Sequence, residues 1–115
     1  MRRGDVFLVN FDPSMGAEPR KTRPAVLVSN DAANATANRN RRGVITVVPI
    51  TSNTTRVYPF QVLLSSGEAG IDRESKAQAE QLRSIDVARL GRRLGAVHPA
   101  TLRQLDDALK LHLAL

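Results

Sequence analysis

From residue 5 to residue 97 the chain consists mainly of short apolar segments that are separated by glycine, proline and polar residues. Such segments are typical of β-strands, because a strand needs only four to eight residues and turn residues end it. Their β-branched residues favour the same interpretation. The pattern predicts strands over residues 5–11, 25–29, 44–50, 60–64, 77–83 and 94–97.

One amphipathic helix is expected at the end of the chain. Pro99 favours the first turn of a helix, and Asp106 and Lys110 have the spacing of an i,i+4 ion pair. Leucines recur at helical spacing and would form one apolar face, namely Leu102, Leu105, Leu109 and Leu113, widened by Leu111 and Leu115. With a shorter helix over 31–38, these elements predict an α+β fold, a barrel-like antiparallel sheet with the terminal helix packed on it.

The length of 115 residues predicts a single domain over residues 1–115. The chain has no cysteine, which excludes disulfides, thiolate metal ligands and cysteine nucleophiles. Its apolar stretches are shorter than the roughly 18–20 residues of a membrane span. The apolar start carries Asp5 and Asn10 and is expected to be a strand and not a signal peptide. These observations predict a soluble, cytoplasmic protein.

The chain is basic, with a net charge of +6, and arginine supplies 14 of its 17 basic residues. Arginine binds phosphate with two parallel hydrogen bonds, so the composition favours a nucleic acid partner. A GC-rich genome would raise the arginine content without any such function. Aromatic side chains are few, so a stacking platform for single strands is nearly absent. Arg39, Arg41 and Arg42 would form either a solvated loop or a patch that follows RNA. Arg89, Arg92 and Arg93 are expected at the surface or facing a protein partner.

Polar residues gather where the second and third predicted strands meet. If Ala25 lies opposite Pro49 in an antiparallel pair, Arg23 and Thr51 share one end of the sheet. A register shifted by one residue would place them on opposite faces. The adjoining loops contribute hydroxyls, an amide, cations and a carboxylate: Glu18, Arg20, Lys21 and Thr22 before Arg23, and Ser52, Asn53, Thr54, Thr55 and Arg56 after Thr51. This rim has the groups that a phosphate site needs.

Several motifs follow one another along nearly the whole chain: Arg2-Arg3-Gly4-Asp5-Val6, Phe11-Asp12-Pro13, Gly16-Ala17-Glu18, Arg23-Pro24-Ala25-Val26-Leu27-Val28-Ser29, Val48-Pro49-Ile50-Thr51-Ser52 and Glu80-Gln81-Leu82-Arg83-Ser84-Ile85-Asp86. In this order they resemble the MazF/PemK family of toxin endoribonucleases. The resemblance implies an SH3-like antiparallel β-barrel (MazF/PemK/CcdB-like) with a C-terminal helix. It also implies a homodimer that cleaves single-stranded RNA at short sequences without metal or other cofactor. An acidic, partly disordered antitoxin would neutralise it.

The resemblance implies that Arg23 and Thr51 are the catalytic pair, with Glu18 beside them. The expected reaction is attack by the substrate's own 2′-OH, which gives a 2′,3′-cyclic phosphate and a 5′-OH end. Some members of the family carry a histidine where this chain has Ala17. Proton transfer is therefore expected to involve Glu18, Arg23 or water.

Further residues are expected to bind RNA near this pair. They are Arg20, Lys21, Thr22, Ser52, Asn53 and Arg56, together with Glu80 and Gln81, for which contacts to substrate bases are expected. No set of side chains has metal-ligand spacing. This agrees with the endoribonuclease without metal that the resemblance implies.

Two other functions remain open from the sequence. The resembled fold also occurs in toxins that bind DNA gyrase through the ends of their C-terminal helices and cut nothing, and such a protein would not need Arg23 and Thr51 at one rim. A catalytically inactive RNA-binding module would be favoured if either residue were replaced, and both are present. The salt dependence of RNA binding separates these classes, because phosphate contacts weaken steeply as salt rises.

Overall fold

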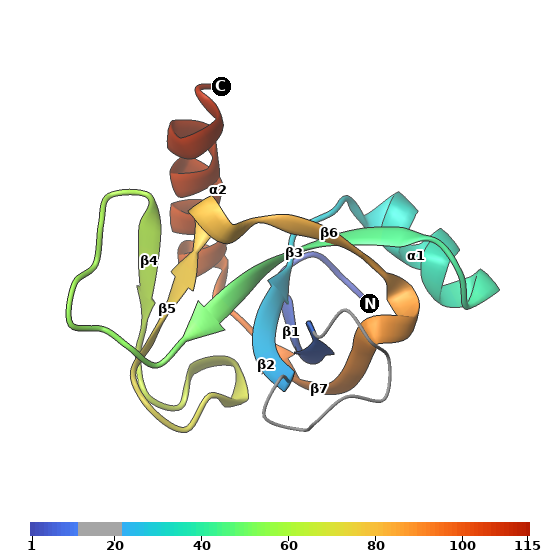
Figure 1. Cartoon of the computed structure of the whole chain (residues 1–115), viewed down its shortest axis with the longest axis horizontal. Coiled ribbons are helices and arrows are strands. Elements are labelled where there is room, and N and C mark those ends of the chain that lie inside the picture. Colours follow the sequence, from blue (N-terminus) through green and yellow to red (C-terminus); the bar gives the residue numbers. More distant parts are fainter. Residues whose placement is uncertain (12–21) are drawn as a thin grey trace.

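The computed structural model describes residues 1–11 and 22–115, and in these residues strands outnumber helices (Figure 1). The strands are β1 Asp5–Asn10, β2 Thr22–Leu27, β3 Val44–Thr51, β4 Gln61–Leu64, β5 Ser75–Gln78, β6 Arg83–Asp86 and β7 Leu90–Ala96. The helices are α1 Asp31–Asn40 and α2 Pro99–Leu113, with short 3₁₀ turns η2 Glu68–Gly70, η3 Ala79–Gln81 and η4 Val87–Arg89. No helix in the described part is both long and apolar enough to span a membrane.

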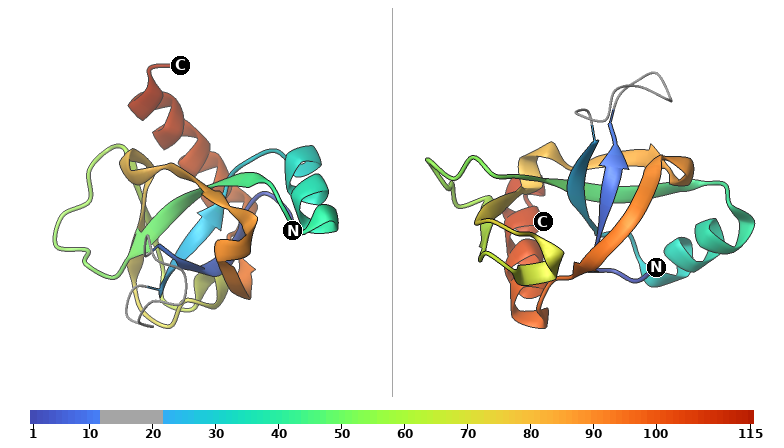
Figure 2. Two further views of the ribbon diagram at one scale, coloured as in Figure 1. Left: turned by 45° about the vertical axis from the view of Figure 1, so that its right-hand side comes forward. Right: turned by 90° about the horizontal axis from the view of Figure 1, so that it is seen from below.

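The strands form one antiparallel sheet in the order β4-β5-β3-β2-β1-β7, and β6 also pairs with β3. The views in Figure 2 show that the sheet curls strongly, with α1 and α2 packed at separate places on it. No pairing joins β4 to β7 among the described residues, so the sheet stays open where a closed barrel would have a seam. The predicted α+β class, with a curled antiparallel sheet and a terminal helix, is confirmed.

The prediction of one continuous strand over 77–83 is wrong, because the structure has two strands there. The chain forms β5, turns through η3 and continues as β6. Both strands pair with β3: β5 with Ile50 and Thr51, and β6 with the segment from Val44 to Val47. Because β3 has eight residues, it has room for two short partners in succession. The last strand begins at Leu90, earlier than expected, directly after a turn that the side chain of Asp86 caps.

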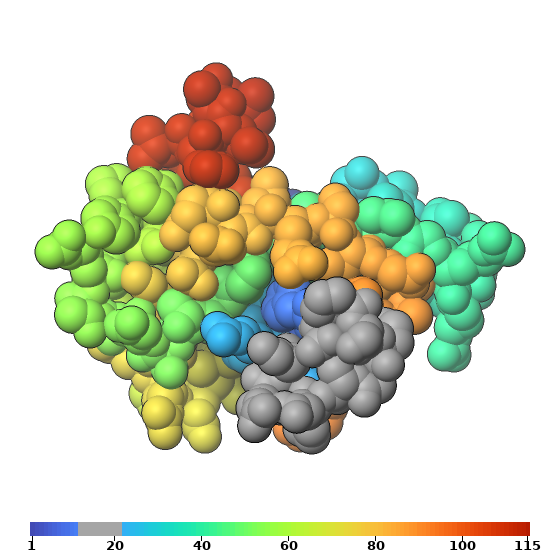
Figure 3. Space-filling view, in the orientation of Figure 1, coloured from blue at the N-terminus to red at the C-terminus, as the bar shows by residue number. Residues whose placement is uncertain are grey.

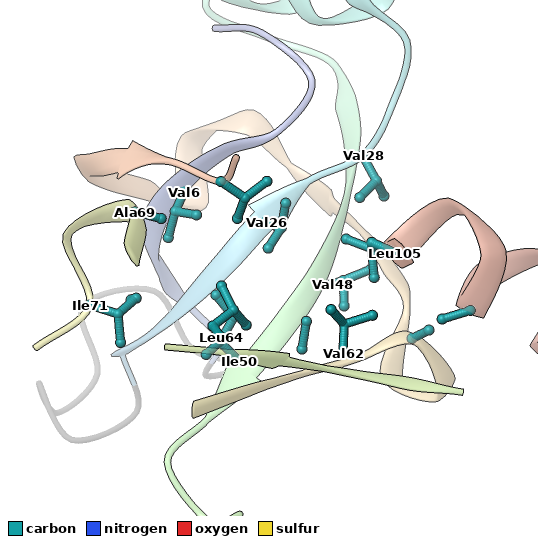
Figure 4. Packing of buried hydrophobic residues seen from close by; sticks show 14 residues of the cluster. Val6, Val26, Val28, Val48, Ile50, Val62, Leu64, Ala69, Ile71 and Leu105 are labelled. Atoms are coloured by element: carbon teal, nitrogen blue, oxygen red, sulfur yellow. The ribbon is translucent and has the colours of Figure 1, made fainter. Parts of the chain in front are cut away.

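Strands β1 and β2 are buried on both faces of the sheet. Val26 and Leu27 are consecutive residues of β2, and both have an exposed fraction of 0%. Since successive side chains of a strand point to opposite faces, they belong to two separate cores. Val26 packs in a cluster that α2 covers, shown in Figure 4, while Leu27 packs with Phe7 and Ile45 on the other side.

The apolar face of α2 ends earlier than its leucines suggest. Leu105 is buried against the sheet, and Leu102 and Leu109 pack around it. The later leucines project into solvent, with exposed fractions of 57% for Leu111, 47% for Leu113 and 86% for Leu115. The expected pairing of Asp106 with Lys110 is also replaced, because the carboxylate of Asp106 accepts a hydrogen bond from the guanidinium of Arg3. This ion pair ties α2 to the start of the chain.

A buried carboxylate fixes the start of β1. Asp5 has an exposed fraction of 7%, and its carboxylate accepts hydrogen bonds from the backbone N–H of Arg2 at 2.9 Å and from the guanidinium of Arg93 at 3.1 Å. Burial acts to raise the pKa of Asp5, but the hydrogen bonds from Arg93 and Arg2 outweigh it and hold this pKa below its usual value. The ionised form of Asp5 therefore stabilises the fold.

Replacing Arg93 should reveal this contribution through its pH dependence. A folded-state pKa below the unfolded value of about 3.9 gives stability that is present above pH 4 and is lost as the pH falls through the folded pKa. We expect Arg93→Gln to lower the free energy of unfolding at pH 7 by about 1 kcal/mol or less, because Arg93 is half exposed. The difference should shrink towards pH 3 in urea titrations. Arg103→Gln, on the exposed side of α2, is the control; an equal loss at both pH values for Arg93→Gln would contradict this role.

Candidate active site

The register of β2 against β3 brings the two expected catalytic residues to one edge of the sheet. Ala25 pairs with Pro49, Val26 with Val48 and Leu27 with Val47, which is the register expected from the sequence. The strands are antiparallel, so the beginning of β2 lies beside the end of β3. The pairing ends at Ala25 and Pro49, and Arg23 and Thr51 lie two residues beyond this last pair, one on each strand.

Arg23 and Thr51 line the same open cleft, which has a volume of about 560 Å³. Its polar lining also includes Ser52, from the end of β3, and residues from two distant segments: Asp72, Arg73 and Arg92. Apolar side chains complete the wall, among them Leu8, Ile50, Ile71 and Leu94. In Figure 3 the start of β2, the end of β3 and the yellow segment that precedes β5 lie beside one another on the visible face.

The cleft holds arginines without anionic partners. In the described part of the chain, Arg23, Arg73 and Arg92 are exposed and form no ion pair, whereas Arg3 and Arg93 pair with Asp106 and Asp5. Asp72 is the only carboxylate among the described residues that line the cleft, so the described arginines outnumber it. The site is therefore positively charged, with guanidinium groups available to an anion.

Two of these arginines could not be located from the sequence. Arg73 precedes β5 and Arg92 lies on β7, both far along the chain from Arg23. They reach the cleft because β7 pairs with β1, which pairs with β2, and because the segment with η2 packs on β7. Arg92 was expected at the surface, and it is exposed in the structure. Its position in the cleft depends on this strand order.

The hydroxyl of Thr51 is held in place by the turn that follows β3. Its Oγ1 accepts a hydrogen bond from the backbone N–H of Asn53 at 3.2 Å, and the side-chain oxygen of Asn53 accepts one from the N–H of Thr55 at 3.2 Å. A hydroxyl that accepts one hydrogen bond still has its own proton to donate. Thr51 is thus suited to donate to an anionic oxygen in the cleft.

A buried lysine fixes the next part of the loop. Lys76 pairs with Thr51 across the β3–β5 ladder, and its exposed fraction is 8%. Its Nζ donates to the backbone carbonyl of Arg56 at 2.5 Å. The backbone at Arg56 is therefore fixed relative to Thr51, although Arg56 is not among the residues that line the cleft.

Several expected RNA-binding residues lie elsewhere. Glu80 and Gln81 are on η3, outside the cleft lining. The Oε2 atom of Glu80 accepts from the side-chain amide of Gln61 at 2.6 Å, while its buried Oε1 has no hydrogen-bond partner among the described residues. Thr22 and Asn53 flank the cleft residues in sequence without lining the cleft. Three further residues of the prediction lie outside the described residues: Glu18, Arg20 and Lys21.

The arrangement suits a phosphodiester bond in an RNA strand. The fork of Arg23 matches two phosphate oxygens, and the hydroxyl of Thr51 provides a third donor. Apolar side chains beside them offer contact area for a base or a ribose. Donors directed at the oxygens where negative charge develops are the main requirement for stabilising a phosphoryl-transfer transition state.

Comparison with known proteins shows which family the chain resembles. Residues 2–113 match the family model described as "PemK-like, MazF-like toxin of type II toxin-antitoxin system". The chain is 61% identical over 115 residues to the endoribonuclease MazF9 of Mycobacterium tuberculosis (strain ATCC 25618 / H37Rv), covering 100% of this chain and 98% of that relative.

Solved structures agree in fold. A crystal structure of MazF from Deinococcus radiodurans has a TM-score of 0.78 at 27% identity, with 100% of this chain and 97% of that chain covered. An endoribonuclease in complex with its cognate antitoxin, from a mycobacterial species, has a TM-score of 0.73 at 27% identity, with 100% and 96% covered. The similarity in both cases extends over the whole chain.

Proposed function

Since the chain belongs to the family of PemK-like, MazF-like toxins of type II toxin–antitoxin systems, we infer that it is a toxin that cleaves RNA as an endoribonuclease. The observation that carries this inference is the cleft in which Arg23 and Thr51 meet beside arginines that form no ion pair within the described residues. A toxin that only binds gyrase would not need this arrangement. The high identity to an endoribonuclease also favours RNA cleavage over that alternative.

The proposed reaction uses the substrate as its own nucleophile. The 2′-OH attacks the adjacent phosphorus, the bond from phosphorus to the 5′ oxygen breaks, and the products are a 2′,3′-cyclic phosphate and a 5′-OH. Arg23 would bind two non-bridging oxygens and Thr51 would donate to a phosphate oxygen, which stabilises the charge of the transition state. Because this nucleophile is already a hydroxyl of the substrate, no metal-bound water is required.

Two protons must also move. The 2′-OH loses one and the leaving 5′ oxygen gains one. Arg23 is a poor base because its guanidinium stays protonated. We therefore assign proton transfer to Glu18 or to water, with Arg23 mainly binding the phosphate; a carboxylate such as Glu18 would need a pKa above its reference value near 4.3 to be an efficient base.

The remaining expected contacts are proposed as the binding surface around the scissile phosphate. Ser52 and Asn53 adjoin Thr51, and Arg73 and Arg92 extend the positive lining of the cleft. Further contacts are proposed for Arg20, Lys21, Thr22, Arg56, Glu80 and Gln81. Single-stranded RNA fits this surface, because its bases are free to turn towards side chains while arginines follow the phosphates.

The proposed partners follow from the family and the charge. We propose that the toxin acts as a homodimer in the cytoplasm and that an acidic antitoxin segment folds on it. A structure of a similar endoribonuclease in complex with its cognate antitoxin supports the existence of an antitoxin partner. The net charge of +6 favours such an acidic partner. RNA and antitoxin should then compete for one surface.

Arg92 gives a specific test of the cleft as the RNA-binding site. Each phosphate contact on a single strand contributes about −0.7 to the slope of log K against log salt. We expect Arg92→Gln to weaken binding of a fully 2′-O-methylated RNA oligonucleotide and to reduce this slope by about 0.7. Fluorescence anisotropy over a series of salt concentrations measures both. Arg103→Gln should keep the wild-type slope, and an unchanged slope in Arg92→Gln would remove Arg92 from the RNA path.

Cleavage itself is tested with purified protein and a long single-stranded RNA in EDTA. The proposed function predicts discrete fragments that arise at a short recurring sequence. A folded protein that leaves the RNA intact and inhibits DNA supercoiling by gyrase would instead support the gyrase-directed poison. A protein that binds RNA at low salt without cutting would support the inactive binding module.

A further inference from the structure

The loop between β3 and β4 brings together two of the few aromatic side chains. The rings of Tyr58 and Phe60 are parallel, with an interplanar angle of 2° and centroids 5.3 Å apart. The guanidinium carbon of Arg56 lies 5.7 Å from the centroid of the Tyr58 ring, and its Nη1 donates to the Tyr58 hydroxyl at 3.1 Å. Because aromatic residues make up only 3% of the chain, the sequence predicted that a stacking platform is nearly absent, and the structure places these two rings together.

The Tyr58 ring is partly exposed, and hydrogen bonds fix the backbone that carries it. Tyr58 has an exposed fraction of 41%, which is high for a ring already in contact with another ring. Its backbone N–H donates to the side chain of Gln61 at 3.1 Å, and Gln61 is buried at the start of β4 and donates to Glu80. The Tyr58 ring therefore has Phe60 stacked on it and the guanidinium of Arg56 over it, and part of its surface remains in solvent.

The stack is also tied to the expected catalytic site. Lys76, directly opposite Thr51, holds the carbonyl of Arg56, two residues before Tyr58. Gln61 pairs with Gln78, which lies two residues after Lys76 on β5, or about 6.5 Å along the strand. The stack therefore lies on the loop that leaves the Thr51 end of β3, and this loop is anchored to β5 on both sides of the stack.

We propose that Tyr58, supported by Phe60 and Arg56, is a stacking subsite for one base of the single-stranded RNA, on the loop that follows Thr51. The inference rests on the proposed nuclease function and extends it to a second binding element. Aromatic faces bind bases of any sequence, and an adjacent arginine adds a phosphate contact or a cation–π contact. The subsite would thus contribute affinity and position the strand, and selection of the cleavage sequence would come from other contacts.

The composition of the chain provides a direct readout. Tyr58 is the only tyrosine and the chain has no tryptophan, so tyrosine fluorescence reports on this ring alone. We expect saturable quenching of this fluorescence when a fully 2′-O-methylated RNA, which lacks the attacking hydroxyl, is added. The midpoint should equal the Kd from anisotropy of the labelled oligonucleotide. Binding detected by anisotropy without quenching would overturn the subsite.

Variants separate stacking from general effects on the loop. Tyr58→Phe keeps the ring and should bind the oligonucleotide nearly as the wild type does. Tyr58→Ala should weaken binding roughly tenfold, since stacking one base typically contributes that much or more. Val57→Ala is the matched control, because Val57 has the same exposed fraction of 41% and adjoins Tyr58. Thermal unfolding of each variant checks that the fold is kept.

The results distinguish this inference from the proposed function. If the wild type cleaves RNA while Tyr58→Ala binds and cleaves as the wild type does, the subsite is wrong and the nuclease stands. If the wild type neither cleaves nor binds RNA, the proposed function itself fails, and the subsite with it. Loss of binding in Tyr58→Ala, retained binding in Tyr58→Phe and Val57→Ala, and quenching by RNA together support the subsite.

Discussion

Arg23→Ala and Thr51→Ala should each reduce the rate of RNA cleavage by at least a hundredfold while the protein stays folded. Removing one preorganised donor to a transition-state oxyanion typically costs 10²–10³ in kcat. Arg23 is exposed and Thr51 is only partly buried, so neither change creates a large cavity. Single-turnover cleavage of a labelled RNA, with thermal unfolding measured in parallel, gives both quantities.

Matched controls test whether this effect belongs to the cleft. Arg23→Lys keeps the charge but loses the planar fork, so its rate should lie between those of the wild type and Arg23→Ala. Thr55→Ala removes an exposed hydroxyl from the same loop and should cleave as the wild type does. Full activity of Arg23→Ala or Thr51→Ala would show that the reaction takes place elsewhere on the protein.

Gly70→Ala should have the largest effect on stability and should damage the cleft as well. Gly70 has a φ of +76°, and a Cβ at this position would lie 2.2 Å from the carbonyl oxygen of Leu94. On the other side of this crossing, a Cβ on Gly95 would lie 2.7 Å from the carbonyl carbon of Ala69. The segment that carries Asp72 and Arg73 thus packs backbone against backbone on β7. The steric conflict should lower the free energy of unfolding by about 3 kcal/mol or more.

Gly67→Ala separates steric conflict from backbone strain. Gly67 has a φ of +93°, but a Cβ there would meet no atom within 4 Å. An alanine with positive φ costs about 1–2 kcal/mol in either position, so the difference between the two variants measures the close approach to β7. Urea titration should show Gly70→Ala to be much less stable than Gly67→Ala, and RNA cleavage should fall only in Gly70→Ala. Equal losses would mean that η2 and β7 do not pack as closely as described.

The sequence was sufficient for the part of the site that depends on neighbouring strands. The antiparallel register assumed for β2 and β3 placed Ala25 opposite Pro49, and the structure has this pair. From that register, Arg23 and Thr51 had to approach one edge. The terminal helix was also predictable, because its periodicity depends on residues that are close in sequence. The solvent exposure of Leu113 was not predictable in this way.

Features that depend on distant contacts were out of reach. The alternating buried residues Ala77 and Ala79 are consistent with one continuous strand, and only the length of β3 explains why the chain turns between β5 and β6. Arg73 and Arg92 enter the cleft through the packing of η2 on β7, which two glycines permit. No periodicity in the sequence marks such a crossing.

The central claim is that the cleft cleaves RNA through the substrate's 2′-OH. Its most direct test uses two oligonucleotides of identical sequence, 2′-O-methylated except at the ribose on the 5′ side of a mapped cleavage site. One has a 2′-OH there and the other a 2′-deoxyribose. In EDTA, the wild type should cleave only the first, leaving a 2′,3′-cyclic phosphate and a 5′-OH end, and Thr51→Ala should cleave neither. Cleavage of the deoxy oligonucleotide, or products with a 5′-phosphate, would contradict the account.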